Sequence, residues 1–464
     1  MNTQDTICAI ATAQGGAIGV IRISGKDAIA ITDRIFTPVG KHPLPLSERK
    51  AYTMAFGHIR QDDGEIIDEV LIGLFKSPHS YTGEDCVEIS CHGSSFILQQ
   101  VMQLLIRKGC RAAGPGEFTQ RAFLNGKMDL SQAEAVADLI ASSSAATHRM
   151  AMNQMRGGFS RELSALRERL LHLTSLMELE LDFSDHEELE FADRSELETI
   201  AGDIEKVISG LVHSFSVGNV LKNGIPVAIV GETNAGKSTL LTTLLNEEKA
   251  IVSDIHGTTR DVIEDTVNLS GITFRFIDTA GIRDTHDTIE NMGIARSFHK
   301  MEQAEIVLWV VDNTCAEAQI RQLSPRILPL CSNKQLIILL NKSDQVSAVP
   351  TKLSGLPENT VTLSISAKEK TGIQELQNLL VKTASVPELT SSDLIVTNVR
   401  HYEALSLALE DIHRVQNGLQ THLSGDFISQ DLRECLFHLA EIVGGEITAD
   451  EVLGNIFMKF CIGK

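Results

Sequence analysis

Apolar and polar positions follow two different rhythms along the first part of the chain. Strand-like apolar runs cover Ile18–Ile23 and Val70–Phe75. Phe96–Lys108 instead repeats its apolar residues at helical spacing, and Gly109 is placed to end that helix. Residues 1–120 therefore predict a mixed α/β domain.

Helical spacing dominates two later parts of the chain that are far apart in sequence. It extends from Thr119 to about Leu221 and resumes from about Thr397 to Ile456. One apolar stripe in the first part repeats at intervals of three and four residues, as on the buried face of a long helix. Its members are Leu163, Leu166, Leu170, Leu173, Met177 and Leu181. We expect the two parts to pack into one helical domain, with the segment between them inserted as a domain whose ends lie close together.

The inserted segment, residues 222–384, alternates strand-like runs with helical spacing. The runs are Pro226–Val230, Phe274–Ile277, Ile306–Val311, Leu336–Leu340 and Val361–Ile365. Apolar strands separated by helices are typical of a parallel sheet that is covered on both faces. The sequence therefore predicts a mainly parallel, doubly wound sheet here, within a multidomain chain of α/β and all-α parts.

Composition narrows the range of partners without identifying one. The 464 residues include 41 lysines and arginines against 61 aspartates and glutamates, which gives a formal net charge of −20. Such a surface repels nucleic acid unless basic residues gather locally. The eight cysteines contain no CxxC pair, so free thiols in a reducing cytosol are favoured over zinc ligands.

No segment indicates export or a membrane partner. The N-terminal 25 residues have no basic region before their apolar stretch, and Gly15 and Gly16 interrupt it. The longest apolar runs are too short to span a bilayer. We therefore expect a soluble, cytoplasmic protein.

Residues 231–238 match the phosphate-loop pattern G-x-x-x-x-G-K-[ST], between a predicted strand and a predicted helix. In such a loop, glycines let backbone N–H groups close around phosphates, and the helix N-terminus adds positive potential. Lys237 is expected to reach the β and γ phosphates, and Ser238 to bind Mg²⁺. Glu232 also lies in this loop, and we expect its acidic side chain to face solvent rather than the phosphates.

Three later segments complete the pattern of a guanine-nucleotide site. Asp278–Gly281 follows a predicted strand, where an acid can approach Mg²⁺ and a glycine N–H the γ-phosphate. Asn341–Asp344 and Ser366–Lys368 end two further strands and resemble the guanine-specificity motifs of GTPases, whose aspartate accepts hydrogen bonds that adenine cannot donate. The motif order predicts GTP hydrolysis. Ile282 directly follows Gly281, at the position where Ras-like GTPases have a glutamine that orients water. An isoleucine cannot do this, so hydrolysis requires another group to orient the water.

Several segments give the chain a resemblance to one particular family. They are Asp5–Thr12, Gly19–Gly25, Thr82–Asp85, Gly114–Lys127, Asn234–Thr239, Gly257–Asp261 and Phe460–Lys464. Together they closely resemble the MnmE (TrmE) family of tRNA uridine-modification GTPases, and the resemblance runs from about residue 5 to residue 464. The GPGEFTQRAF segment and the terminal CIGK are not features of G domains in general.

The resemblance implies an architecture, partners and a reaction. Residues 1–120 would form an α/β domain that binds a tetrahydrofolate derivative and dimerises. Residues 121–221 and 385–464 would form a discontinuous helical domain. Residues 222–384 would form the inserted GTPase domain. The homodimer would act with the MnmG (GidA) flavoprotein, which uses FAD and NADH, in a heterotetramer or larger complex. Together they would add an aminomethyl or carboxymethylaminomethyl group to carbon 5 of the wobble uridine of tRNA, with 5-formyl- or 5,10-methylene-tetrahydrofolate as the folate. The choice of tRNAs, and of glycine or ammonium as donor, stays open.

The resemblance also implies roles for individual residues of the GTPase domain. The GTP-binding positions would be Asn234, Ala235, Gly236, Lys237, Ser238, Thr239, Ser253, Asp254, Ile255, His256, Gly257, Thr258, Thr259, Asp278, Thr279, Ala280, Gly281, Asn341, Lys342, Asp344, Ser366 and Ala367. Mg²⁺ is assigned to Ser238 and Thr259. A potassium ion, which would neutralise charge developing between the β and γ phosphates, is assigned to Asn234, Ser253, Ile255 and Thr258. Candidate catalytic residues here are Lys237, Asn234 and Glu290, the last as the residue that orients water.

Four charged residues match the folate-contacting positions of the family, namely Arg22, Glu88, Lys127 and Lys464. Cations suit the glutamate tail of a folate, and a carboxylate suits the amidine edge of its pterin. Cys461 is a further candidate for a catalytic role. It does not fit a prenylation signal, because Gly463 is not aliphatic and Lys464 is not a usual terminal residue. A buried structural thiol and a catalytic thiol near the folate remain as alternatives.

Two other functions stay open on the sequence. A regulatory GTPase switch, for example in ribosome assembly, would share the G domain but not the folate site, so folate binding distinguishes it. A folate-dependent aminomethyltransferase with a vestigial G domain is disfavoured by the intact Lys237, Asp278 and Asp344.

Overall fold

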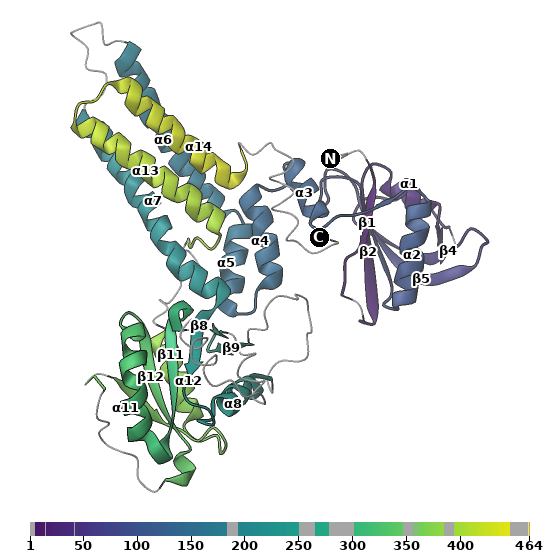
Figure 1. Cartoon of the computed structure of the whole chain (residues 1–464). Coiled ribbons are helices and arrows are strands. Elements are labelled where there is room, and N and C mark those ends of the chain that lie inside the picture. The colour runs from purple at the N-terminus through teal and green to yellow at the C-terminus, as the bar shows by residue number, and fades with distance from the viewer. Residues whose placement is uncertain are drawn as a thin grey trace. The chain divides into compact units, whose positions relative to one another are not determined.

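The computed structural model describes residues 5–13, 15–40, 42–182, 194–249, 265–277, 301–346, 356–357, 360–384, 394–445 and 463 (Figure 1). The chain divides into two compact units. One unit contains Met1–Ala141, Ala151–Ser209 and Glu403–Lys464, and the other contains Ser142–Met150 and Gly210–Tyr402. The predicted domain boundaries near residues 120, 221 and 384 stay predictions.

The first unit begins with a sheet whose strand order is β3-β4-β5-β6-β2-β1-β7. The strands are β1 (Ile7–Ile10), β2 (Ile18–Ser24), β3 (Phe36–Pro38), β4 (Thr53–Arg60), β5 (Ile66–Phe75), β6 (Cys86–His92) and β7 (Arg111–Ala112). Neighbours are antiparallel except β1 and β7, which are parallel. Every second residue through the middle of β5 is buried, so one face of the sheet meets a core. Helices α1 (Ala28–Asp33) and α2 (Ser95–Arg107) contribute to that same core.

Helices form the rest of the first unit and lead into the second. They are α3 (Glu117–Leu124), α4 (Leu130–Ala141), α5 (Ala145–Met155), α6 (Gly158–Asp182), α7 (Arg194–Asn223), α13 (Val399–Gln420) and α14 (Gly425–Val443). On α6 the stripe from Leu163 to Met177 is buried, as predicted, while the side chain of Leu181 lies outside the described part. Helix α14 packs against α6 although some 250 residues separate them, and Arg433 pairs with Glu178 at 2.7 Å. The two helical parts of the sequence therefore do meet.

The second unit contains a sheet of strand order β13-β12-β11-β8-β10-β9. Its strands are β8 (Ile225–Val230), β9 (Asp265–Leu269), β10 (Ile272–Phe276), β11 (Ile306–Asp312), β12 (Gln335–Asn341) and β13 (Val361–Ser364). All neighbours are parallel except β9 and β10, as the sequence predicted for a mainly parallel sheet. Helices α8 (Lys237–Lys249) and α12 (Ile373–Thr383) pack into one core, and α11 (Ala316–Ile327) into another, so helices cover both faces. Short 3₁₀ turns are η1 (Leu46–Glu48) in the first unit, and η2 (Asn313–Cys315), η3 (Leu328–Cys331) and η4 (Ser343–Gln345) in the second.

The edge strand β9 is an element that the sequence analysis did not identify. It forms a hairpin with β10 through Ser270 and Gly271, both at positive φ, which suits a tight two-residue turn. Only Val267 of β9 is buried. An edge strand buries too little apolar surface to leave a continuous apolar run, which explains the omission.

Among the described residues, none of the helices has the length and apolar character needed to cross a membrane.

Candidate functional site

The predicted phosphate loop connects the end of β8 to the start of α8, as its sequence pattern requires. Two of its glycines lie at positive φ and against neighbouring chain. A Cβ on Gly231 would lie 2.1 Å from the carbonyl oxygen of Val310, and one on Gly236 would lie 2.1 Å from Asn341 Nδ2. Only glycine fits either place. Asn234 also has positive φ, at 65°, and its side chain is exposed on the loop.

Lys237 begins α8 and turns back over its own loop. Its Nζ donates to the carbonyl oxygens of Gly231 at 2.8 Å and Glu232 at 2.7 Å. The ammonium therefore stands at the N-terminus of a 13-residue helix, where the helix dipole and the N–H groups of the first turn also favour an anion. Ser238 is half-buried in the same first turn, while Ala235 is buried and Thr239 exposed.

The ends of β8, β12 and β13 are fastened together by the buried Asn341. Its Nδ2 donates to the Ala235 carbonyl oxygen at 2.8 Å, and its Oδ1 accepts from the Ala367 N–H at 2.9 Å. Ser366 Oγ donates to Asp344 Oδ1 at 2.6 Å. The Asp344 side chain is exposed in this structure, so a bound base would have to supply its burial. The three motifs thus meet at the carboxyl edge of the sheet, where α/β folds bind ligands.

Glu232 faces solvent only in part, so that expectation holds only in part. Its side chain is half-buried, and its Oε2 accepts a hydrogen bond from Gln319 Nε2 at 2.8 Å. The neighbouring Asp312 pairs with Lys342 at 2.5 Å. Burial opposes ionisation of Asp312, but hydrogen bonds from Lys342 and Thr314 outweigh it and hold the pKa of this carboxyl below its ordinary value. Neither Gln319 nor Asp312 belongs to a recognised motif, so sequence reasoning missed both.

Many predicted site residues lie outside the described part of the chain. They are Ser253, Asp254, Ile255, His256, Gly257, Thr258, Thr259, Asp278, Thr279, Ala280, Gly281, Glu290, Cys461 and Lys464. Their assignments stay predictions.

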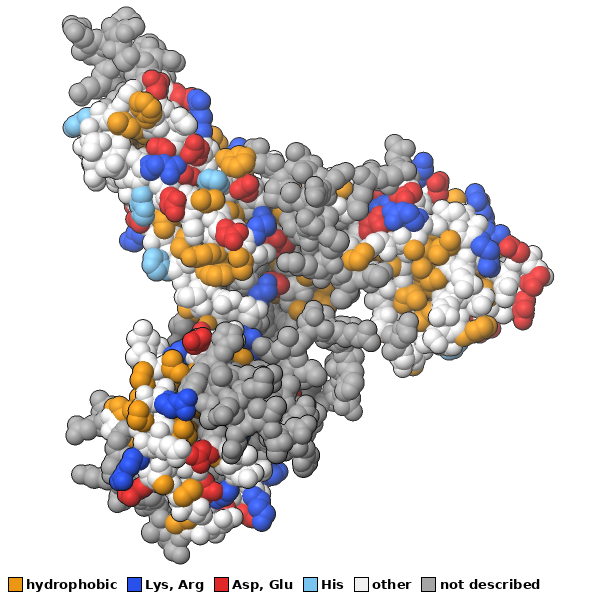
Figure 2. All heavy atoms as spheres, in the orientation of Figure 1, with side chains coloured by type: hydrophobic (Ala, Val, Ile, Leu, Met, Phe, Trp, Pro, Cys, Tyr) orange, Lys and Arg blue, Asp and Glu red, His pale blue; other side chains and the backbone are white. Residues whose placement is uncertain are grey.

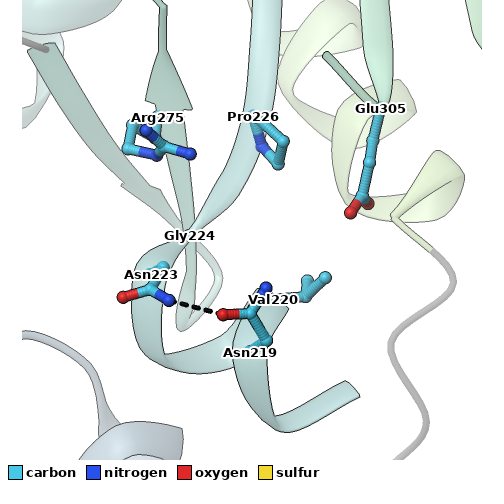
Figure 3. A pocket seen from close by; sticks show the side chains of 7 residues that line it. All are labelled: Asn219, Val220, Asn223, Gly224, Pro226, Arg275 and Glu305. Carbon is cyan, nitrogen blue, oxygen red and sulfur yellow. Dashed lines mark hydrogen bonds between the residues drawn. The ribbon is translucent and has the colours of Figure 1, made fainter. Parts of the chain in front are cut away.

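A cavity of about 380 Å³ opens elsewhere in the second unit (Figure 3). It is lined by Asn219, Val220, Asn223, Gly224, Pro226, Arg275 and Glu305. Gly224 and Pro226 lie at the start of β8, whereas the phosphate loop follows the end of β8. The cavity therefore lies at the amino edge of the parallel strands and is not the predicted nucleotide site.

The structure brings together two of the four predicted folate-contacting residues. Arg22 on β2 lies opposite Glu88 on β6, and Arg22 Nε donates to Glu88 Oε1 at 2.9 Å. The guanidinium also lies over the rings of Tyr81 and Phe118, 5.5 and 5.7 Å from their centroids. Both side chains of the pair stay partly exposed, at 24% and 32%. The exposed Lys127 donates to the Pro78 carbonyl oxygen at 3.0 Å.

The GPGEFTQRAF segment supplies a buried ion network that the sequence did not reveal. Arg121 is only 3% exposed and contacts Asp5 at 2.6 Å, Glu117 at 3.1 Å and Glu84 at 3.2 Å. Hydrogen bonds from Arg111 and Arg121 hold the pKa of Asp5 below its ordinary value. Asp5 and Glu84 are far from Arg121 in sequence, and such pairs carry no pattern along the chain, which is why the network went unseen. It stabilises the segment that carries one of the resemblance motifs.

The last described residue, Gly463, is buried against β1. It has φ of 96°, and a Cβ on it would lie 2.5 Å from the Ile10 carbonyl oxygen. Glycine is therefore required there for both conformation and space.

Comparison with known proteins places these features in one family. Residues 6–127 match the family described as GTP-binding protein TrmE N-terminus, and residues 130–461 match the MnmE helical domain. A protein of Bacteroides thetaiotaomicron named tRNA modification GTPase MnmE is 66% identical over 467 residues, covering 99% of this chain and 100% of that protein. The chain belongs to the MnmE family.

Other MnmE proteins are similar over the same extent. The protein of that name from Parabacteroides distasonis is 64% identical over 462 residues, covering 99% of this chain and all of its own length. The one from Flavobacterium johnsoniae is 52% identical over 473 residues and covers the whole of both chains. The MnmE resemblance seen in the sequence is therefore confirmed.

Proposed function

We propose that this MnmE-family chain is a GTP hydrolase that takes part in tRNA modification. One observation carries the proposal. Asn341 joins the phosphate loop to the two guanine-specificity motifs at one edge of the sheet, through bonds to Ala235 and Ala367. This arrangement would hold a phosphate site and a base site at a fixed distance from each other. The relatives of the chain carry the name tRNA modification GTPase.

The finer reaction extends this proposal. With a flavin-dependent partner, MnmG, the chain would help to add an aminomethyl or carboxymethylaminomethyl group to carbon 5 of the wobble uridine, using a tetrahydrofolate one-carbon donor. We propose that it acts as a cytoplasmic homodimer. On the face that Figure 2 shows, lysine and arginine side chains of the described residues lie among aspartates and glutamates. Binding of tRNA would need a surface on which basic side chains gather locally.

Nucleoside analysis tests the whole proposal. A strain that lacks the gene should lose the modified wobble uridine from its tRNA, and the wild-type gene should restore it. The Asp344→Asn gene should fail to restore it if GTP is the nucleotide used. Unchanged nucleosides in the deletion strain would refute the role in tRNA modification.

The described residues of the phosphate loop suit a charge-stabilising mechanism. Lys237 and the N-terminus of α8 would hold the β and γ phosphates and stabilise charge that develops during hydrolysis. Ser238 would help to hold Mg²⁺, and the exposed Asn234 side chain would help to hold potassium, which would supply positive charge between the phosphates. Glu290 would orient the attacking water in place of the glutamine that Ile282 replaces. Pairing of two G domains would exclude water and couple turnover to dimerisation.

Hydrolysis should therefore depend on the monovalent cation. Single-turnover rates in potassium should exceed those in sodium by about tenfold or more, because one transition-state charge contact is lost. Asn234→Ala should abolish this difference while nucleotide affinity stays similar in either salt. The control is Asn333→Ala, at an exposed position before β12. Equal wild-type rates in the two salts would count against the cation mechanism.

We further propose that Arg22, Glu88, Lys127 and Lys464 contact a folate. Substitution of Cys461 separately tests the alternative of a catalytic thiol near the folate. The Arg22–Glu88 pair offers a cation and a carboxylate side by side, backed by the Tyr81 and Phe118 rings. These groups suit the charged tail and the amidine edge of a folate.

Calorimetry with 5-formyltetrahydrofolate and the full-length chain tests this site. Arg22→Ala should lower the affinity by about 10–100-fold, since a hydrogen bond to a charged group is lost and Glu88 loses its partner. Arg60→Ala is the matched control, because the Arg60 guanidinium donates to the carbonyl oxygen of Gly64 in a turn. Wild-type protein that binds no folate would overturn the assignment.

A further inference from the structure

The predicted phosphate loop contains an acidic residue, Glu232, whose backbone contacts the lysine of the same loop. The backbone carbonyl oxygen of Glu232 lies 2.7 Å from Lys237 Nζ. A carboxylate on the same residue is within reach of that ammonium. An ion pair between them would compete with phosphates for the lysine and would place negative charge beside the phosphates.

Gln319 holds this carboxylate elsewhere. Its Nε2 donates to Glu232 Oε2 at 2.8 Å, from a side chain on α11 that is only 8% exposed. Its Oε1 accepts from the Asp312 N–H at 2.9 Å. Because a backbone N–H can only donate, this second bond fixes the amide with its NH₂ group toward Glu232.

The anchor of Gln319 is itself rigid. Asp312 ends β11, and its Oδ1 accepts from the Thr314 N–H at 3.0 Å and from Thr314 Oγ1 at 2.7 Å. Its other oxygen pairs with Lys342 of the guanine-specificity motif at 2.5 Å. Strands β8, β11 and β12 are neighbours in the sheet, so the chain Glu232–Gln319–Asp312–Lys342 crosses three adjacent strand ends.

We infer that Gln319 is a positioning residue for the phosphate loop, which holds the Glu232 carboxylate against α11 and away from Lys237. The Glu232 carboxylate then does not compete with phosphates for Lys237. The inference rests on the proposed function in one respect, namely that this loop binds nucleotide phosphates.

The hydrogen bond from Gln319 to Glu232, here called the tether, is tested by exchanging the amide and the carboxylate between the two positions. Gln319→Glu keeps an acceptor for the Asp312 N–H but cannot donate to Glu232, so it removes the tether and also adds a negative charge beside the Glu232 carboxylate. It should weaken binding of GTP, GDP and inorganic pyrophosphate by roughly tenfold, the size expected for a lost hydrogen bond to a charged group. In the double variant Glu232→Gln/Gln319→Glu, the new amide at 232 can donate to the new carboxylate at 319. The pair then has its original net charge, and most of the lost affinity should return.

Fluorescence titration with each ligand gives the affinities, and thermal melting checks that every variant is folded. Gln319→Leu removes both the donor to Glu232 and the acceptor for the Asp312 N–H. Adding Glu232→Gln should therefore restore less affinity to Gln319→Leu than to Gln319→Glu. A double variant as weak as Gln319→Glu alone would overturn the inference, because Gln319 would then act only as packing. So would a folded Gln319→Glu protein of wild-type affinity. Wild-type binding of pyrophosphate without GTP would refute the guanine assignment alone, and the pyrophosphate series would still decide the tether.

Discussion

Replacing Asp344 by asparagine should weaken GTP binding on the order of 10²–10³-fold and should improve binding of xanthosine triphosphate. Ser366 Oγ donates to Asp344 Oδ1 at 2.6 Å and so fixes the carboxylate at the end of β12. Guanine presents two N–H donors to such a group. An amide offers only one acceptor and turns its own NH₂ group toward the second donor. Xanthine carries a carbonyl oxygen at carbon 2 in place of the amino group, and that oxygen accepts from the amide.

Competition between a fluorescent guanine nucleotide and GTP, xanthosine triphosphate or ATP measures this change. The matched control is Glu369→Gln, which removes a carboxylate charge from an exposed neighbour in the adjacent loop. Two results would contradict the guanine assignment. One is an Asp344→Asn protein with wild-type affinity for GTP, and the other is wild-type protein that hydrolyses ATP as fast as GTP.

Lys237→Ala should lower single-turnover GTP hydrolysis on the order of 10²–10³-fold, because it removes a charge aimed at the transition state. The ammonium is held at the loop by the carbonyl oxygens of Gly231 and Glu232. Nucleotide affinity should fall as well, since the β phosphate loses a cation in the ground state.

Lys334→Ala provides a closely matched control for the lysine. Lys334 Nζ also donates to two carbonyl oxygens, those of Glu302 and Ala304, each at 2.7 Å. It precedes β12 and so lies at the amino edge of the strands, opposite the predicted site. Rapid-quench measurement with enzyme in excess separates hydrolysis from product release. Similar losses in the two variants would show that removal of any such lysine disturbs the domain, and would remove the special role of Lys237.

Much of the fold followed from local pattern. The strand before the phosphate loop, the helix after it and the buried stripe on α6 were all predicted, because the spacing of apolar residues reflects which face of an element is buried. The edge strand β9 was missed, since it buries only Val267. No pattern along the chain pairs Arg22 with Glu88, two predicted folate contacts, and only the register of β2 and β6 places them opposite each other.

The sequence by itself determined which chemical groups the chain carries and in what order: a glycine-rich loop with Lys237, and later an asparagine and an aspartate after an apolar strand. Each motif is contiguous, so its residues are neighbours in any fold that the chain adopts. Only the tertiary structure decided which groups meet across the strand ends. Glu232 bonds Gln319 because β8 and β11 are adjacent and α11 covers that side of the sheet, and Asp312 reaches Lys342 because β11 and β12 are adjacent. Strand order depends on packing between segments far apart in sequence, and no local spacing encodes it.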